Sequence, residues 1–322
     1  MTPSSRYDVV ALGELVIDLV PVASAYEAPC FAAKPGGAPG NVAVGVARLG
    51  GRAAMLSKVG EESFGRLLID TLRRYGVATT GVPTTRAGNT SLAFVTILPD
   101  GDRDFMLYRN GCAESTYGPA ELDEAVVRAT RVLHVGSLIL GHPVSAATQR
   151  RAVRIARESG ALISVDINLR SSLWPNRQDM RAAAAEAAES ANILKASRDE
   201  LELLTGEPDP ATAIAKLWRP DLHAIAVTFG ADGAILATPQ HVAAAPGFPV
   251  SVVDTVGCGD AFTASLLTDL AVSPAEINSA AGLDRLVRRA CAAGALAATA
   301  AGGMDAMPTA EQRDAFMASV GA

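Results

Sequence analysis

The chain has few cysteines and few aromatic residues, and it lacks a long hydrophobic run. Its cysteines stand far apart, with no CxxC pair and no histidine at metal-ligand spacing: Cys30, Cys112, Cys258 and Cys291. This pattern indicates reduced thiols in a cytoplasmic protein rather than a disulfide scaffold or a structural zinc site. The apolar stretch Ala290–Ala301 is too short to span a bilayer, and the first residues lack a signal-peptide pattern, so we expect no membrane association.

A net positive charge is also absent. The formal net charge is -6 and the pI is near 5.3, which disfavours a nucleic-acid partner. The first apolar run leads into Gly13–Val16 (GELV) without a GxGxxG fingerprint, and no GxxxxGK[ST] loop is present. A dinucleotide-binding oxidoreductase and a P-loop enzyme are therefore both disfavoured.

Short apolar runs alternate with helical periodicity along most of the chain. A strand is predicted at Tyr7–Gly13, a helix at Asn41–Leu49 and another strand at Ala224–Thr228. Two helices are predicted towards the end, from about Gly259 to Ala271 and from about Ala275 to Ala300. This order predicts an α/β fold with a doubly wound, mainly parallel sheet, which binds ligands at the carboxyl ends of its strands.

One hairpin interrupts this series. Thr90–Leu98 and Arg103–Arg109 flank a PDGD turn, which is a strong hairpin signal. Together with Val16–Val22, the hairpin is expected to form a small β-sheet lid. We therefore predict a single domain over residues 1–322, with a lid formed by about 14–37 and 84–113.

The segment Asp254–Asp260 (DTVGCGD) carries the clearest chemical signal. Its small residues Gly257, Cys258 and Gly259 permit a tight turn into a helix, whose first N–H groups can hold a phosphate. Asp260 at this position could accept a proton from an attacking hydroxyl. Alternatively, Asp260 merely caps the helix.

A glycine-rich loop precedes the first predicted helix. Gly36 and Gly37 permit close approach of the backbone to a ligand, and Asn41 offers a donor and an acceptor to vicinal hydroxyls. By itself, a tight loop with an asparagine cap explains this motif better.

Two further motifs follow predicted strands. Lys195–Glu200 (KASRDE) could hold hydrated Mg²⁺ through Glu200, but Ser197 and Glu200 also fit a capping box, which is the better explanation of the segment alone. The glycines of Thr228–Gly233 (TFGADG) suit a nucleotide pocket, and an ordinary β-turn explains them equally well.

The order of these motifs resembles that of the ribokinase-like (PfkB) carbohydrate kinases, from about residue 7 to 303. Gly13–Asp18 comes first, and the segments around Gly36–Asn41, Lys195–Glu200 and Asp254–Asp260 follow. Segments between them are similar to bacterial fructokinases, among them the run Asn168-Leu169-Arg170.

The resemblance implies a ribokinase-like fold, an ATP-dependent sugar kinase and specific roles. Asp260 would be the base, and the amides of residues 257 to 260 would form the anion hole. The sugar would be bound by the loop glycines and by polar side chains: Asp18, Gly36, Gly37, Asn41, Arg109 and Arg170. The nucleotide site would be lined by Lys195, Thr228, Gly230, Gly233, Gly257 and Gly259. Glu200 would organise Mg²⁺, and K⁺ would sit near Asp254 and Val256.

The chain departs from the family pattern at two positions. Cys258 replaces the usual alanine of the GxGD turn, and a thiol at a helix N-terminus is expected to have a lowered pKa and to react with alkylating agents. Ser197 replaces the asparagine of the Asn-x-x-Glu motif, which weakens the case for direct metal contact.

The resulting prediction is transfer of the ATP γ-phosphoryl group to a hydroxyl of a sugar, most readily fructose. The alternatives are a 2-keto-3-deoxygluconate kinase, with which Arg109 and Arg170 are compatible, a nucleoside kinase, and a catalytically silent sugar-binding regulator. By analogy with the family, a homodimer through the lid is expected.

Overall fold

The computed structural model describes residues 7–23, 28–97, 103–169 and 174–321. Its centre is a nine-stranded sheet in the order β15-β14-β13-β12-β11-β10-β1-β4-β6. Neighbouring strands from β6 to β13 are parallel, and β14 and β15 extend the sheet in antiparallel fashion. The bounds are β1 (Tyr7–Leu12), β4 (Ala53–Leu56), β6 (Ala78–Gly81), β10 (Thr130–Gly136), β11 (Leu162–Asp166), β12 (Ile193–Ser197), β13 (Ala224–Thr228), β14 (Ala234–Ala237) and β15 (Val242–Ala245).

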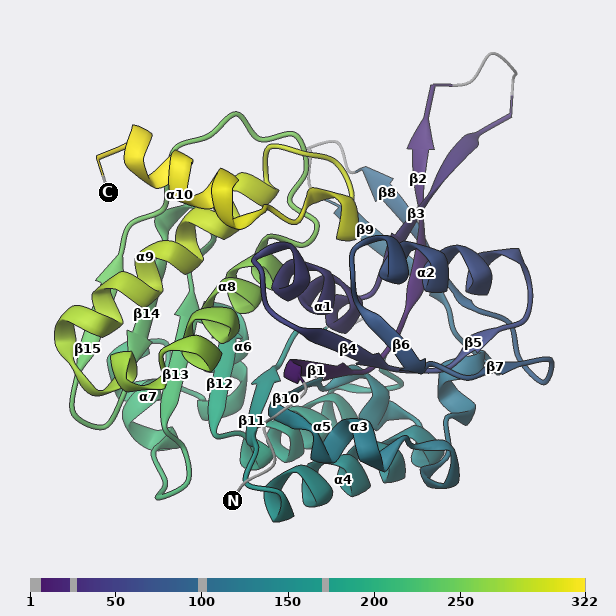
Figure 1. Ribbon diagram of the computed structural model, residues 1–322, viewed down its shortest axis with the longest axis horizontal. Coiled ribbons are helices and arrows are strands. Elements are labelled where there is room, and N and C mark those ends of the chain that lie inside the picture. Colours follow the sequence, from purple (N-terminus) through teal and green to yellow (C-terminus); the bar gives the residue numbers. More distant parts are fainter. Residues whose placement is uncertain (1–6, 24–27, 98–102, 170–173, 322) are drawn as a thin grey trace.

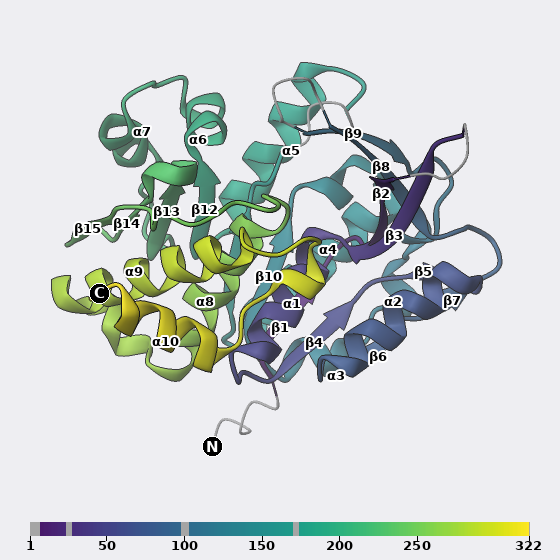
Figure 2. The same cartoon turned by 90° about the horizontal axis from the view of Figure 1, so that it is seen from above.

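Helices cover both faces of this sheet (Figures 1 and 2). Strand β1 shows why, because its alternate side chains enter two different hydrophobic cores: Val9 and Ala11 lie in one, Val10 and Leu12 in the other. The first core is covered by α1 (Ala38–Arg48), α2 (Ser63–Arg74), α8 (Cys258–Val272) and α9 (Ala280–Ala297), with α10 (Ala310–Ser319) outside α9. The second is covered by α3 (Glu124–Arg128), α4 (Pro143–Glu158), α5 (Arg177–Ser190), α6 (Arg198–Thr205) and α7 (Pro210–Leu217). The doubly wound fold is confirmed.

A separate four-stranded sheet projects from one side of the molecule (Figure 1). Its order is β3-β2-β8-β9, from β2 (Val16–Val22), β3 (Cys30–Gly36), β8 (Ser91–Ile97) and β9 (Arg103–Tyr108). Strands β8 and β9 pair antiparallel, so the hairpin is confirmed, while its PDGD turn lies outside the described residues. We call this sheet the lid sheet. A further two-stranded sheet joins β5 (Val59–Gly60) and β7 (Thr84–Thr85).

The elements near the end of the chain differ from the sequence prediction. The single helix expected from about Ala275 to Ala300 is wrong, because a 3₁₀ turn at Pro274–Asn278 precedes α9 and Ser279 caps it by accepting a hydrogen bond from Gly282 N at 3.1 Å. Helix α10 was not predicted. Within the described part of the chain, no helix has both the length and the apolar character needed to cross a membrane.

Candidate active site

The glycine turn before α8 forms at the predicted position. Gly257 is the N-cap with φ 82°, a left-handed conformation that glycine adopts without strain. A Cβ at this position would lie 2.9 Å from Met307 Cε, the end of a flexible side chain, so it is the backbone conformation that requires glycine. Helix α8 starts at Cys258, and its first-turn N–H groups have no partner within the helix. The turn therefore offers donors to an anion.

Asp260 lies in the first turn of α8 and contacts Asn41 of α1. Asn41 Nδ2 donates to Asp260 Oδ2 at 2.7 Å across a separation of 219 residues. Both side chains are buried, and Asn41 Oδ1 has no hydrogen-bond partner among the described residues. The N-cap of α8 is Gly257 rather than Asp260, and the N-cap of α1 is Gly37 rather than Asn41, so neither residue is the N-cap of its helix.

The glycine-rich loop brings the backbone close to strand β2. Gly37 is the N-cap of α1 with φ 101°, and a Cβ there would lie 2.5 Å from the carbonyl oxygen of Glu14. A Cβ at Gly36 would lie 2.3 Å from Asp18 Oδ2. Asp18 is buried, so the loop glycines and this carboxylate share one small region.

Arg109 follows β9 and is also buried, at 8% exposure. Its Nε donates to Glu114 Oε1 at 3.0 Å, while Nη2 has no hydrogen-bond partner among the described residues. Arg170, predicted beside it, lies outside the described residues. An unpaired buried donor usually marks the place of a ligand or an ordered water.

Lys195, in the middle of β12, lies close to the glycine turn. A Cβ at Gly259 would come within 3.1 Å of Lys195 Nζ. Asp166, at the end of β11, holds the ammonium at 3.0 Å. Burial would lower the pKa of Lys195, but Asp166 and Glu200 raise it above its usual value, so the side chain stays charged. Burial, and to a smaller extent Lys195, lowers the pKa of His134 to about 3, so this histidine is neutral.

Glu200 joins two backbone segments. Its Oε2 accepts from Ser197 N at 2.7 Å and its Oε1 from Leu169 N at 2.6 Å, while Ser197 Oγ accepts from Glu200 N. The capping box is confirmed. The bond to Leu169 holds the loop after β11, where Asn168 has a φ of 40°. With both carboxylate oxygens in use, a metal ion fits here only through water.

The TFGADG segment forms a short 3₁₀ turn between β13 and β14. Thr228 pairs with Ala234 at the base of this hairpin, and Gly230 (φ 60°) begins the turn. A Cβ at Gly233 would lie 2.0 Å from the carbonyl oxygen of Ala245. The turn explanation is therefore confirmed, and these residues lie at the carboxyl end of β13, where Thr228 is paired with Ser197 of the neighbouring strand.

The segment 298–307 follows α9 and packs against the glycine turn; we call it the strap. Asp254 is buried; its Oδ1 accepts from Val256 N at 2.8 Å and its Oδ2 from Gly302 N at 3.0 Å. Gly303 lies so close to Asn41 that an added Cβ would be 2.6 Å from its side chain. Among the described residues, no three His, Cys, Asp or Glu side chains group as a metal site.

Cys258 differs from expectation. The lowered pKa predicted for its thiol is wrong: burial, with Asp260 and Asp254 nearby, raises the pKa to about 11. The two carboxylates and the loss of solvation outweigh the dipole of α8.

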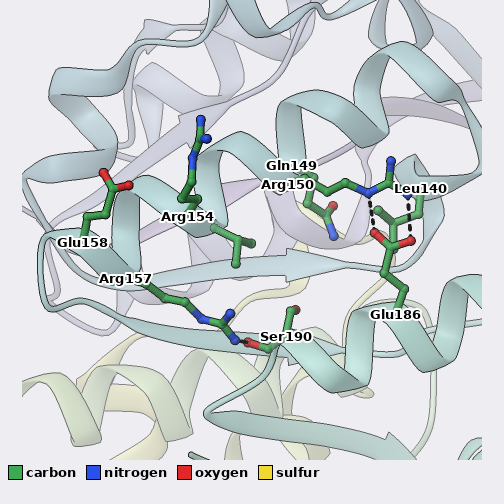
Figure 3. A pocket seen from close by; sticks show the side chains of 9 residues that line it. Leu140, Gln149, Arg150, Arg154, Arg157, Glu158, Glu186 and Ser190 are labelled. Atoms are coloured by element: carbon green, nitrogen blue, oxygen red, sulfur yellow. Dashed lines mark hydrogen bonds and ion pairs between the residues drawn. The ribbon is translucent and has the colours of Figure 1, made fainter.

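A pocket of about 300 Å³ lies elsewhere, between α4 and α5 (Figure 3). None of the predicted site residues lines it. Arg150 binds Glu186 across it in a bidentate ion pair at 2.6 and 2.7 Å, so the charges at its rim are largely compensated. We assign it no part in the site.

Some site residues were missed by sequence reasoning. Glu14, Asp166 and Glu114 are buried acids whose neighbours come from distant segments. Asp166 alone left a signal, since an acid at the end of an apolar strand of a parallel sheet faces the ligand edge. Nothing local marked Glu114, which lies in a 3₁₀ turn at Ala113–Thr116.

A glycine turn at a helix start, a buried carboxylate beside it and a fixed lysine over it are the parts of a site that transfers an anionic group to a hydroxyl. Comparison with known proteins gives the family: residues 6–310 match the pfkB family carbohydrate kinase, and the chain belongs to this family.

Individual relatives agree with this membership. The chain is 40% identical over 314 residues to Fructokinase-2 of Solanum habrochaites, covering 96% of this chain and 95% of that one. It is 41% identical over 305 residues to Fructokinase-1 of Oryza sativa subsp. japonica, covering 94% of each. Among solved structures, it superposes on fructokinase with bound ATP from Xylella fastidiosa with a TM-score of 0.90, at 29% identity and with 98% and 100% of the two chains covered. The likeness thus extends beyond the bacterial enzymes expected from the sequence, to plant ones.

Proposed function

We propose that this carbohydrate kinase is an ATP-dependent fructokinase. The main supporting observation is the 2.7 Å hydrogen bond between Asn41 and Asp260 at the glycine turn, which joins α1 to the start of α8. Relatives of this chain are named fructokinases, and one solved relative, from Vibrio cholerae O395, is described in a form with fructose, ADP and calcium ion bound (TM-score 0.85, 32% identity).

The proposed reaction begins with binding of the sugar under the lid sheet. Asp18 accepts hydrogen bonds from its hydroxyls, and Asn41 can accept and donate them. Gly36 and Gly37 allow close approach of the sugar. Arg109 directs its open Nη2 at the sugar. Arg170 is included by resemblance. Asp260 then accepts the proton of the attacking hydroxyl. The Asn41 amide keeps the carboxylate oriented for this step.

The phosphoryl group is stabilised by the glycine turn and by Lys195. The N–H groups of Gly257, Cys258 and Gly259, with the ammonium of Lys195, face the charge that develops on its oxygens. Thr228, Gly230 and Gly233 line the rest of the nucleotide site.

Two cations complete the proposal. Glu200 would hold Mg²⁺ through water, and the ion would supply positive charge to the phosphates when ATP is bound. K⁺ would sit beside Asp254 and Val256, whose segment is already fixed to the strap by Gly302.

A coupled ADP-release assay tests the proposal. Purified protein is given ATP and Mg²⁺ with fructose, ribose, 2-keto-3-deoxygluconate or nucleosides, each with and without K⁺. We expect fructose to give the highest kcat/KM. A higher value for 2-keto-3-deoxygluconate would support the alternative kinase, and ATP-dependent turnover of no sugar would support the silent regulator.

We also propose a homodimer through the outer face of the lid sheet. Phe31, Phe94 and Tyr108 form a row of edge-to-face aromatic contacts, with centroids 5.3 and 5.4 Å apart. Phe31, Tyr108 and the neighbouring Met106 are exposed, at 39%, 56% and 54%. The opposite face of the sheet carries Asp18, so the aromatic row points away from the sugar site and suits a second copy.

The cytoplasmic location is likewise a proposal. Cys112, Cys258 and Cys291 are reduced thiols in the structure, as a reducing compartment would keep them. Fractionation of the source cells with an antibody to the protein would test it.

A further inference from the structure

Arg109 directly follows β9 of the lid sheet, and its guanidinium is fixed from one side. Nε is bonded to Glu114 at 3.0 Å and the side chain is only 9% exposed, so it has little freedom to swing. The open Nη2 therefore has a set direction. Taken alone, such an arginine would suit either a hydroxyl or a carboxylate of a sugar.

Glu114 is held as firmly as its partner. It is 2% exposed, and its Oε1 accepts from Ser91 Oγ at 2.5 Å as well as from Arg109. Two donors on one oxygen keep the carboxylate in place, and its negative charge compensates the guanidinium inside a region of low dielectric.

Two further titratable groups interact with Arg109, and neither adds a positive charge. Glu14 is fully buried; burial raises its pKa to about 7, Arg109 opposes the shift, and Glu114 and Asp260 add to it. Burial, with Arg109 next, lowers the pKa of His142, which keeps this imidazole neutral. An anion at Arg109 would therefore meet Glu114 and a partly ionised Glu14.

We infer that Glu114 determines specificity: by cancelling the charge of Arg109, it makes the site accept neutral sugars and reject sugar acids. Discrimination of this kind acts through repulsion of the wrong ligand as much as through contacts to the right one. The inference rests on the proposed function and names the substrate class of the same site. Glu114 acts as a positioning residue, through Arg109.

The test compares wild type with Glu114→Gln, which keeps the hydrogen-bond acceptor for Ser91 and Arg109 but removes the charge. Steady-state kinetics are measured for fructose and for 2-keto-3-deoxygluconate. We expect kcat/KM for fructose, divided by kcat/KM for 2-keto-3-deoxygluconate, to fall at least about 10-fold, because the charge that compensates Arg109 is lost. Most of the change should lie in the KM of the acid. Glu114→Asp keeps the charge and should keep the wild-type preference.

Glu121→Gln is the matched control, since Glu121 forms an ion pair with Lys58 at 2.8 Å in a neighbouring turn. It should leave the ratio unchanged. A ratio in Glu114→Gln within twofold of wild type, or an equal change in Glu114→Asp, overturns the inference. If Glu114→Gln melts below the assay temperature, the test is inhibition of the wild type by a sugar acid. Competition with fructose at comparable affinity overturns the inference. Weak competition supports it. Wild type that turns over neither sugar refutes the proposed function instead.

Discussion

At the scale of single residues, the site combines one contact between distant segments with several buried charges. The Asn41–Asp260 contact defines where a hydroxyl would be deprotonated, and the Lys195–Asp166 pair places a cation opposite to it. Each is formed by side chains whose segments meet only after the sheet has assembled.

Replacing Asp260 with Asn should lower kcat by about 10²–10⁴-fold, the usual contribution of a general base, while KM for the sugar changes less. The amide keeps the size of the carboxylate, so a thermal melt should show a folded protein. Asp284→Asn, at an exposed position of α9, is the control and should match wild type in kcat. Equal kcat in both variants would contradict the base assignment.

Glu14 predicts a pH dependence of stability. Burial raises the folded pKa of Glu14 to about 7, above the usual 4.5, so the folded state binds more protons between these values and stability falls as pH rises through this window. The loss for this group alone is about 3 kcal/mol, at about 1.4 kcal/mol per pKa unit. Urea unfolding of wild type and Glu14→Gln at several pH values between 4.5 and 8 measures it, with a flatter profile expected for the variant. Identical slopes would rule out a raised pKa.

At the scale of elements, the turn that begins α8 carries most of the function and tolerates the least change. Gly257→Ala would force a side chain into a left-handed conformation and against Met307, 2.9 Å away. Such strain costs on the order of 1–3 kcal/mol. We expect a lower melting temperature together with a reduced kcat. Gly50→Ala, where φ is 89° and an added Cβ meets nothing within 4 Å, should destabilise the fold but leave kcat intact.

The same turn protects its own cysteine. Because the pKa of Cys258 is raised to about 11, little thiolate exists at pH 7.5, and alkylation there should be slow. Activity should survive prolonged treatment with iodoacetamide at that pH, and peptide mass spectrometry should find Cys258 unmodified. Rapid loss of activity with a label on Cys258 would show a reactive thiol.

Elements with strong local signals could be predicted from the sequence. The hairpin, the glycine turn and helix α8 follow from turn chemistry and apolar periodicity, which act over a few residues. The break at Ser279 was missed because alanine-rich periodicity continues across it, and only the serine cap reveals it. Strand β3, an edge strand of the lid sheet, was missed because its alternation includes Lys34 and Pro35.

At the scale of the whole molecule, charged contacts between distant segments were beyond the sequence. The Lys195–Asp166 pair is an example, because its residues are 29 positions apart and meet only through the pairing of β11 with β12. By contrast, the side of the sheet that binds ligands was predictable, because carboxyl ends of parallel strands meet at one edge.

The aromatic row of the lid sheet predicts a homodimer through the outer face of that sheet. Phe31→Glu should place a charge in the proposed interface and give monomers in sedimentation equilibrium at concentrations where wild type is dimeric. Val242→Glu, at an exposed position of the distant edge strand β15, is the control and should not change the mass. A wild-type monomer at every concentration would contradict the proposal.

The strap after α9 has a practical consequence for anyone redesigning this enzyme. Through Gly302 it fixes the carboxylate of Asp254, and through Gly303 it abuts Asn41, so one short stretch contacts both the proposed K⁺ segment and a proposed sugar-binding residue. Libraries aimed at new acceptors should therefore vary the lid strands and leave residues 298–307 untouched, because a change there would alter recognition of donor and acceptor at once.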